Sequence, residues 1–199
     1  MSPAPTAAPK AAPKTAPKAA PELGPIMIPA VVGNGRLEPI EKMEAHRTGQ
    51  LHLAVSVFVH DAEGRLLIQR RAASKYHCPG QWANTACTHP HWDEPPAAAA
   101  RRRLREELGF TTDLAERRTI DYRAEVGNGL IEHERVTLYT ARLDAGPAIC
   151  PDPAEVDATR WIAPADLAAM LRDEPGALTP WFRIYLERFT DFEAFGDRT

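Results

Sequence analysis

The stretch EPPAAAARRRLREELG, residues 94–109, has the composition of a helix followed by its stop signal. Ala, Arg, Leu and Glu have high helix propensity, and two prolines stand in the first turn, where proline is tolerated. Gly109 follows as the left-handed residue that commonly ends a helix. We therefore expect a helix over residues 94–108 and work outward from it.

Strands are expected on both sides of this helix. Residues 51–59, LHLAVSVFV, are apolar on both faces, as in a buried strand. A turn at 61–64 leads into a return strand at 65–71, so these two strands are expected to form a hairpin. Further strands are expected at 119–125, 131–142 and 158–162, and further helices at 164–171 and 178–189. This mixture predicts an α+β fold or a mixed-sheet α/β/α sandwich.

Length and composition describe one ordinary domain and exclude several classes of protein. The chain has 199 residues, a formal net charge of -3, 26% charged residues and 44% hydrophobic residues. It has neither the basic excess of a nucleic-acid-binding protein nor an apolar run long enough to span a membrane. Three cysteines are too few and odd in number for a disulfide framework. We therefore expect a cytoplasmic protein with no nucleic-acid or membrane partner.

Residues 1–25 are of low complexity. Proline recurs every four residues from Pro9 to Pro25, and most of the remainder is alanine and lysine. Such a segment has almost nothing to bury and cannot offset its ordering entropy, so we expect an extended tail. A dispensable tail is the favoured interpretation and a docking arm is the alternative. The folded domain is expected over residues 26–199.

Two short motifs carry groups that are suited to chemistry. Cys87 and His89 are two residues apart, so in an extended segment their side chains share one wall of a pocket. Glu132 and Glu134 likewise face one way on a strand, and two close carboxylates raise each other's pKa unless a cation lies between them. The alternatives are a structural cysteine beside a chance histidine, and a solvated edge strand.

His46 and His52 flank the start of the first buried strand. Together with His89, Glu132 and Glu134 they would form a site of three histidines and two carboxylates. Five nitrogen and oxygen ligands suit Mn²⁺ or Mg²⁺, and Zn²⁺ is possible. The alternative is that the two histidines are ordinary surface residues.

Charged residues in and before the helix suggest an ion-binding site. Glu106 and Glu107 lie at the C-terminal end of the helix, where the helix dipole disfavours carboxylates unless solvent or a hard cation compensates. Arg71 and Lys75, with Arg102 and Arg103 on the helix, supply donors suited to phosphate oxygens. An ordinary charged helix and surface solubility are the alternatives.

Several of these segments resemble type 1 isopentenyl-diphosphate isomerase, a family with the Nudix fold. The segments are His46, LHLA at 51–54, RRAASK at 70–75, CPGQWANTACTHP at 78–90, EHE at 132–134 and Pro-Trp at 180–181. They follow the family's order at nearly its spacing, across about residues 30–190, although the interval between His46 and His52 is one residue shorter. The resemblance implies a Nudix-type α/β/α sandwich with a mixed sheet. It also implies isomerisation of isopentenyl diphosphate to dimethylallyl diphosphate in isoprenoid biosynthesis.

The Nudix box, G-x5-E-x7-R-E-U-x-E-E-x-G-U, falls on residues 88–110 with two departures. Thr88 stands in place of the glycine, and Arg103 in place of the first glutamate of the Arg-Glu pair. The missing carboxylate weakens a hydrolase's metal cluster. Hydrolysis of a nucleoside diphosphate derivative is therefore the alternative function, and a non-catalytic metal-binding or scaffold domain is a third hypothesis.

The resemblance also implies roles for the site residues. Cys87 and Glu134 would lie on opposite faces of the bound alkene and exchange protons with it through a tertiary carbocation. Trp181 would stabilise that cation by its π face, and Tyr122 would assist Glu134. Which of the two groups protonates first stays open, because the reaction is reversible.

A monomer or weak homodimer is expected.

The ligands implied for a Mn²⁺ or Zn²⁺ ion are His46, His52, His89, Glu132 and Glu134. The residues implied for the diphosphate and its Mg²⁺ are Arg71, Lys75 and Glu107.

Overall fold

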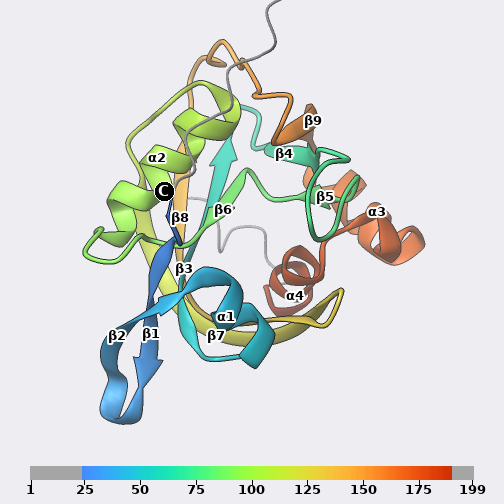
Figure 1. Cartoon of the computed structure of the whole chain (residues 1–199). Coiled ribbons are helices and arrows are strands. Elements are labelled where there is room, and N and C mark those ends of the chain that lie inside the picture. The colour runs from blue at the N-terminus through green and yellow to red at the C-terminus, as the bar shows by residue number, and fades with distance from the viewer. Residues whose placement is uncertain (1–23, 190–199) are drawn as a thin grey trace, which may run out of the picture.

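The structure, a computed structural model, describes residues 24–189 and contains one mixed nine-stranded sheet with helices on both faces (Figure 1). The predicted α/β/α arrangement is confirmed. The tail expected over residues 1–25 lies outside the described residues except for its last two. No helix between residues 24 and 189 is long and apolar enough to cross a membrane.

The elements alternate along the chain. The strands are β1 (Met27–Val32), β2 (Arg36–Glu41), β3 (His52–His60), β4 (Leu66–Arg71), β5 (Trp82–Ala83), β6 (Ala86–Thr88), β7 (Ala115–Gly127), β8 (Leu130–Arg142) and β9 (Val156–Ile162). The helices are α1 (Lys42–Thr48), α2 (Pro96–Leu108), α3 (Pro164–Asp173) and α4 (Pro180–Arg188), with short 3-10 turns at Gly33–Gly35 and Pro175–Ala177.

β3 is the central strand, and both of its faces are buried, as its apolar sequence predicts. It runs parallel to β8 along its whole length and pairs antiparallel with β6. Val57 packs into an apolar cluster that includes α2, whereas the adjacent Phe58 packs into the cluster that includes α3 and α4. The sheet is therefore covered on both sides, with α2 on one face and α3 and α4 on the other (Figure 1).

The hairpin expected over residues 51–71 forms only at its turn. β3 and β4 are paired through His60 and Leu66 alone. Beyond that point β4 pairs with β5 and β9, while β6 takes the neighbouring position on β3. The apolar pattern identifies both strands correctly, but it does not specify their partners. Residues at the end of β4 and after it (71–77), and at the end of β6 and after it (87–92), line the site described below.

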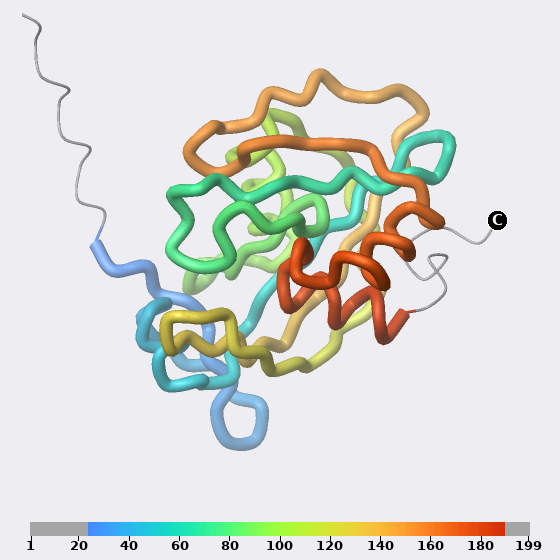
Figure 2. Tube along the Cα trace, turned by 90° about the vertical axis from the view of Figure 1, so that its right-hand side faces the viewer, coloured from blue at the N-terminus to red at the C-terminus, as the bar shows by residue number. Residues whose placement is uncertain are grey.

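Before residue 51 the structure contains a hairpin and a helix that the sequence did not predict. β1 and β2 pair antiparallel and project from the body of the protein (Figure 2). α1 begins after Glu41, whose carboxylate accepts hydrogen bonds from two backbone N–H groups of the first turn at 2.8 Å. It ends at Gly49, which has a φ of 66°. This short helix carries Lys42 and His46 to the site.

The helix predicted over residues 94–108 forms as α2, which begins at Pro96 and ends at Leu108, directly before Gly109. This residue has a φ of +76°, and a Cβ atom on it would lie 2.8 Å from the carbonyl oxygen of Cys150. Both the left-handed backbone and the close approach require glycine. The end of α2, with its glutamates, is thereby held at a defined place over the sheet.

Candidate active site

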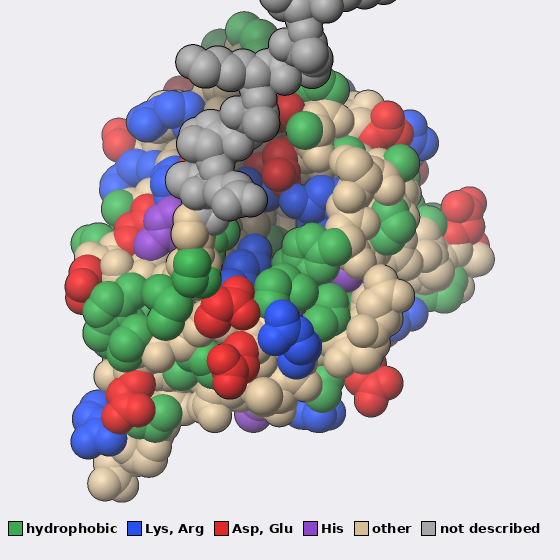
Figure 3. All heavy atoms as spheres, in the orientation of Figure 1, with side chains coloured by type: hydrophobic (Ala, Val, Ile, Leu, Met, Phe, Trp, Pro, Cys, Tyr) green, Lys and Arg blue, Asp and Glu red, His purple; other side chains and the backbone are tan. Residues whose placement is uncertain are grey.

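A cavity of about 750 Å³ lies between α1, α2, α4 and the sheet. This size suits a small-molecule ligand. Lys and Arg side chains gather at the hollow in the centre of the face shown in Figure 3. The cavity has one end lined by histidine and glutamate, which we call the histidine end, and one lined by lysine and arginine, which we call the cationic end.

Four side chains converge at the histidine end, where His89 and Glu134 line the cavity and His46 and His52 are fully buried beside them. The ligand atoms of His46, His52, His89 and Glu134 all lie within 4.8 Å of one another. They come from α1, β3, the segment after β6, and β8, so distant parts of the chain meet here. The parallel pairing of β3 with β8 sets His52 directly beside Glu134. The short interval between His46 and His52 is accommodated because His46 sits on a helix and His52 on the next strand.

Backbone carbonyls fix two of these imidazoles. His46 Nδ1 lies 2.7 Å from the carbonyl oxygen of Lys42, and His52 Nδ1 lies 2.7 Å from that of Gln50. A carbonyl can only accept, so each Nδ1 carries the proton and each Nε2 keeps its lone pair. The Nε2 of His46 is buried and has no hydrogen-bond partner within residues 24–189. Such an orphan atom is the expected mark of a missing ligand.

The protonation states at this end suit metal binding. Burial lowers the pKa of His46 to about 4 and that of His89 to about 3, so both imidazoles are neutral near pH 7. Burial alone would raise the pKa of Glu134, but the imidazoles of His52 and His89 outweigh it and hold that pKa well below its usual range. Neutral imidazoles and an ionised carboxylate are the forms that bind a cation.

Glu132 and Glu134 project to the same side of β8. The hydroxyl of Tyr122 lies 2.9 Å from Glu132 Oε2 and 2.7 Å from Glu134 Oε2. His133 points the other way, with its Nδ1 2.9 Å from the carbonyl oxygen of Gly49. Burial, followed by the charge of Glu134, raises the pKa of Glu132. Two buried carboxylates therefore share a single hydroxyl proton, which favours a cation at this position.

Cys87 lies on β6, directly opposite Ser56 of β3. Its Sγ is 3.0 Å from Asn84 Oδ1 and 3.1 Å from Ser56 Oγ, which is itself 3.0 Å from the hydroxyl of Tyr185. The Asn84 amide donates to two backbone carbonyls at 3.1 Å, so its oxygen is held toward the thiol. Burial raises the pKa of Cys87 to about 12, so the group is a thiol, not a thiolate, near pH 7.

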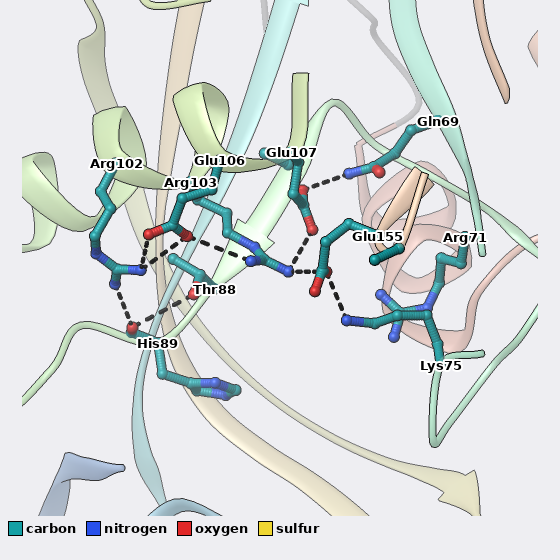
Figure 4. Close-up of polar contacts among 12 residues, drawn as sticks. Gln69, Arg71, Lys75, Thr88, His89, Arg102, Arg103, Glu106, Glu107 and Glu155 are labelled. Carbon is teal, nitrogen blue, oxygen red and sulfur yellow. Dashed lines mark hydrogen bonds and ion pairs between the residues drawn. The ribbon is translucent and has the colours of Figure 1, made fainter. Parts of the chain in front are cut away.

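At the cationic end, the guanidinium of Arg103 lies between two carboxylates (Figure 4). Its Nη2 is 2.6 Å from Glu107 Oε1 and also contacts Glu155 Oε2. Lys75 Nζ is 2.6 Å from the same Glu155 oxygen, and Gln69 donates to Glu107 Oε2 at 2.7 Å. The arginine that replaces a Nudix-box glutamate therefore supplies a positive charge where the box would supply a negative one.

Arg71 and Trp181 lie together on the cavity wall. The guanidinium carbon of Arg71 is 5.3 Å from the ring centroid of Trp181, within cation–π range. Trp181 lies in the first turn of α4 and is only 3% exposed. Trp181 thus lines the cavity and also contacts Arg71, the basic residue expected to bind phosphate.

Three residues that line the cavity were not predicted from the sequence. Lys42 lies one helical turn before His46; burial, followed by the charge of Arg103, lowers its pKa to about 8. His77 lies 3.2 Å from Glu132 Oε1 and forms a second possible ligand group with Glu132 and His46. Glu155 precedes β9. A prediction of α1 would have placed Lys42 and His46 on one face of a helix. For His77 and Glu155, no pattern in the neighbouring sequence indicated a place in the site.

The NUDIX domain profile matches residues 50–182. A protein of Cereibacter sphaeroides named isopentenyl-diphosphate Delta-isomerase is 55% identical over 163 residues, which cover 80% of this chain and 90% of that protein. The chain belongs to the isopentenyl-diphosphate Delta-isomerase family of Nudix proteins. A member from Dinoroseobacter shibae is 51% identical over 166 residues, covering 83% of this chain and 93% of its own length.

Solved structures show the same Nudix fold. A Deinococcus radiodurans protein matches with a TM-score of 0.65 and 18% identity, covering 81% of this chain and 98% of its own. A MutT protein of Methanosarcina mazei matches with a TM-score of 0.56 and 18% identity, covering 70% and 93%. At this identity the likeness concerns the fold alone.

Proposed function

We propose that this chain interconverts isopentenyl diphosphate and dimethylallyl diphosphate in isoprenoid biosynthesis, the activity named for its relatives. One observation carries the proposal: a protonated thiol, Cys87, and an ionised carboxylate, Glu134, line the same cavity. Moving a double bond by one position requires one group that gives a proton and one that removes a proton. The two groups exchange these roles when the reaction reverses.

The cavity wall supplies what a carbocation needs. Protonating an unactivated alkene creates a tertiary carbocation in the substrate, which water would trap. Trp181 is almost fully buried and presents its ring to the cavity, so it would stabilise the cation in a dry environment. The Tyr122 hydroxyl, bonded to Glu134, would hold or pass the proton of that carboxyl group.

A Mn²⁺ or Zn²⁺ ion fits the histidine end. The donors His46, His52, His89 and Glu134 are gathered, and the orphan Nε2 of His46 faces no other partner within residues 24–189. Glu132 would join as the fifth ligand. When bound, the ion would neutralise the paired carboxylates and tune the acidity of Glu134.

The diphosphate and its Mg²⁺ are assigned to the cationic end. Among residues 24–189, Glu107 joins neither metal-ligand group, and it already accepts from Gln69 and pairs with Arg103. We propose that Glu107 holds Mg²⁺ only together with diphosphate oxygens. Arg71 and Lys75 would contact the same oxygens. This end fits an ion that arrives with the substrate.

A cytoplasmic location is also proposed. Cys78, Cys87 and Cys150 are all free thiols in the structure. A reducing compartment keeps such thiols reduced.

The test is an assay of the purified protein with isopentenyl diphosphate and Mg²⁺, following acid-labile dimethylallyl diphosphate. The wild type is expected to form product, and Cys87→Ala is expected to form none while keeping its fold and metal content. Equal turnover by Cys87→Ala would contradict the role of the thiol. Release of monophosphate from nucleoside diphosphates, which the position of Arg103 disfavours, would identify a hydrolase instead.

A further inference from the structure

His77 stands between the two ends of the cavity. It belongs to the loop after β4, whose ends are joined by backbone hydrogen bonds from Arg71 N to Gln81 O and from Gly80 N to Arg71 O, both 3.0 Å. His77 is 7% exposed, and its ring contacts that of Trp181 at a centroid distance of 5.7 Å. The closed loop and this packing hold the imidazole in one orientation.

Both nitrogen atoms of this imidazole have charged neighbours. Nδ1 is 2.8 Å from Arg71 Nη2, and Nε2 is 3.2 Å from Glu132 Oε1. A guanidinium can only donate hydrogen bonds, so Nδ1 must accept and carries no proton. The neutral ring then carries its proton on Nε2, which donates it to the Glu132 carboxylate.

This tautomer decides how His77 relates to the metal-ligand residues beside it. His77, Glu132 and His46 place ligand atoms within 4.8 Å of one another, so His77 has the position of a possible ligand. An imidazole that binds a metal through Nε2 must carry its proton on Nδ1, where it would face the N–H of Arg71. The hydrogen bond from Arg71 therefore makes His77 a donor to a ligand and not a ligand itself.

We propose that His77 is a positioning residue that couples the diphosphate-binding arginine to the metal-binding carboxylate. It receives a hydrogen bond from Arg71 at the cationic end and gives one to Glu132 at the histidine end. This proposal rests on the proposed function for the roles of Arg71 and Glu132. Because one rigid ring bonds to both residues, it would hold the diphosphate-binding group and the metal-binding group in a fixed relative position.

Three substitutions separate the two hydrogen bonds. His77→Gln places an amide N–H near the Nε2 position and keeps the donor to Glu132. His77→Asn places an amide oxygen near the Nδ1 position and keeps the acceptor for Arg71. His77→Phe keeps a ring against Trp181 but removes both hydrogen bonds. The Kd for Zn²⁺ is measured by competition with a chromophoric chelator, and the Kd for inorganic pyrophosphate by calorimetry on metal-loaded protein. KM and kcat for isopentenyl diphosphate are measured in parallel, and far-UV circular dichroism checks folding.

We expect His77→Gln to bind Zn²⁺ like the wild type, with KM and the pyrophosphate Kd raised about tenfold by loss of a charge-assisted hydrogen bond. His77→Asn should keep the pyrophosphate Kd but bind Zn²⁺ about 10- to 100-fold more weakly, with a lower kcat. His77→Phe should show both defects; if it does not fold, the Gln and Asn variants decide the question.

Two results would overturn the proposal. Loss of Zn²⁺ binding in His77→Gln would make His77 a direct ligand. If His77→Phe bound Zn²⁺ and pyrophosphate like the wild type, or if the Gln and Asn variants had identical defects, His77 would not couple the two groups. Because both binding measurements need no turnover, a failure of the isomerase assignment would show separately, as an inactive wild type with this binding pattern intact.

Discussion

The two ends of the cavity differ in what their ligand-binding groups already contact. At the histidine end, His46 Nε2 is buried and has no hydrogen-bond partner within residues 24–189. At the cationic end, Lys75 and Arg103 converge on Glu155, so each of these charges is already paired. One end has an unused metal-ligand atom, His46 Nε2, and the other has formed ion pairs among its own side chains.

This difference indicates how each end would meet its ligand. An unsatisfied buried polar atom costs about 1–3 kcal/mol, which a bound metal would recover without rearranging the fold. Anion binding at the cationic end must instead exchange Glu155 for ligand oxygens on Lys75 and Arg103. The histidine end is therefore arranged before binding, whereas the cationic end changes its pairing on binding.

The largest effect is expected from Glu134→Gln, because Glu134 serves both the proton transfer and the metal cluster. We expect kcat to fall at least about 10³-fold, within the range for loss of a proton-transfer group. Steady-state kinetics against isopentenyl diphosphate would measure it. The control is Glu125→Gln, an exposed carboxylate on the neighbouring strand β7. A tenfold loss or less in Glu134→Gln would remove this carboxylate from the chemistry.

Metal binding should stabilise the protein through the histidine end. At about 100 times the Kd, added Zn²⁺ or Mn²⁺ should stabilise the chelator-treated protein by about 2.7 kcal/mol. His46→Gln should abolish most of this gain, because it removes the orphan Nε2 ligand atom. Thermal unfolding with and without metal would show it, with the exposed His91→Gln as control. Equal stabilisation of His46→Gln and the wild type would argue against this ligand set.

The histidine end should also make the metal-free protein sensitive to acid. The pKa of His46 is about 4 in the folded state and about 6.5 when unfolded, so the unfolded chain binds more protons between these values. Stability is therefore full above pH 6.5 and falls as the pH drops toward 4. From pH 7 to 5 the wild type should lose about 1–2 kcal/mol more than His46→Gln, measured by urea unfolding in chelator. Parallel pH curves for the two proteins would contradict this.

The smallest effect is expected at the cationic end. Glu155→Gln removes the carboxylate that competes with an anion for Lys75 and Arg103, so the affinity for inorganic pyrophosphate should rise about two- to fivefold. Calorimetry on the metal-loaded protein would measure it. Asp157→Asn is the matched control, because Asp157 is an exposed carboxylate two positions after Glu155 and pairs with Arg70 instead of Lys75 or Arg103. Weaker binding in Glu155→Gln would mean that Glu155 arranges the cations and does not compete for them.

Much of the fold and part of the site followed from local patterns. The strand at 51–59, the helix at 94–108 and the paired motifs Cys87/His89 and Glu132/Glu134 all depend on the period of the element that carries them. Side chains two apart on a strand share a face whatever the strand pairs with. Residue types and spacing therefore made these pairs candidate site residues, and the resemblance to the isomerase family singled them out.

The remaining features depended on which distant segments meet. The divergence of β4 from β3, the parallel pairing that sets His52 beside Glu134, and the convergence of Lys75 and Arg103 on Glu155 have no local signal. The role proposed for His77 likewise arises only because its loop reaches both Arg71 and Glu132. The sequence by itself determined which chemical groups are present and which face of each element carries them. The tertiary structure decided their partners, because hydrogen bonds and ion pairs act over a few ångströms while these residues are up to about 80 positions apart along the chain.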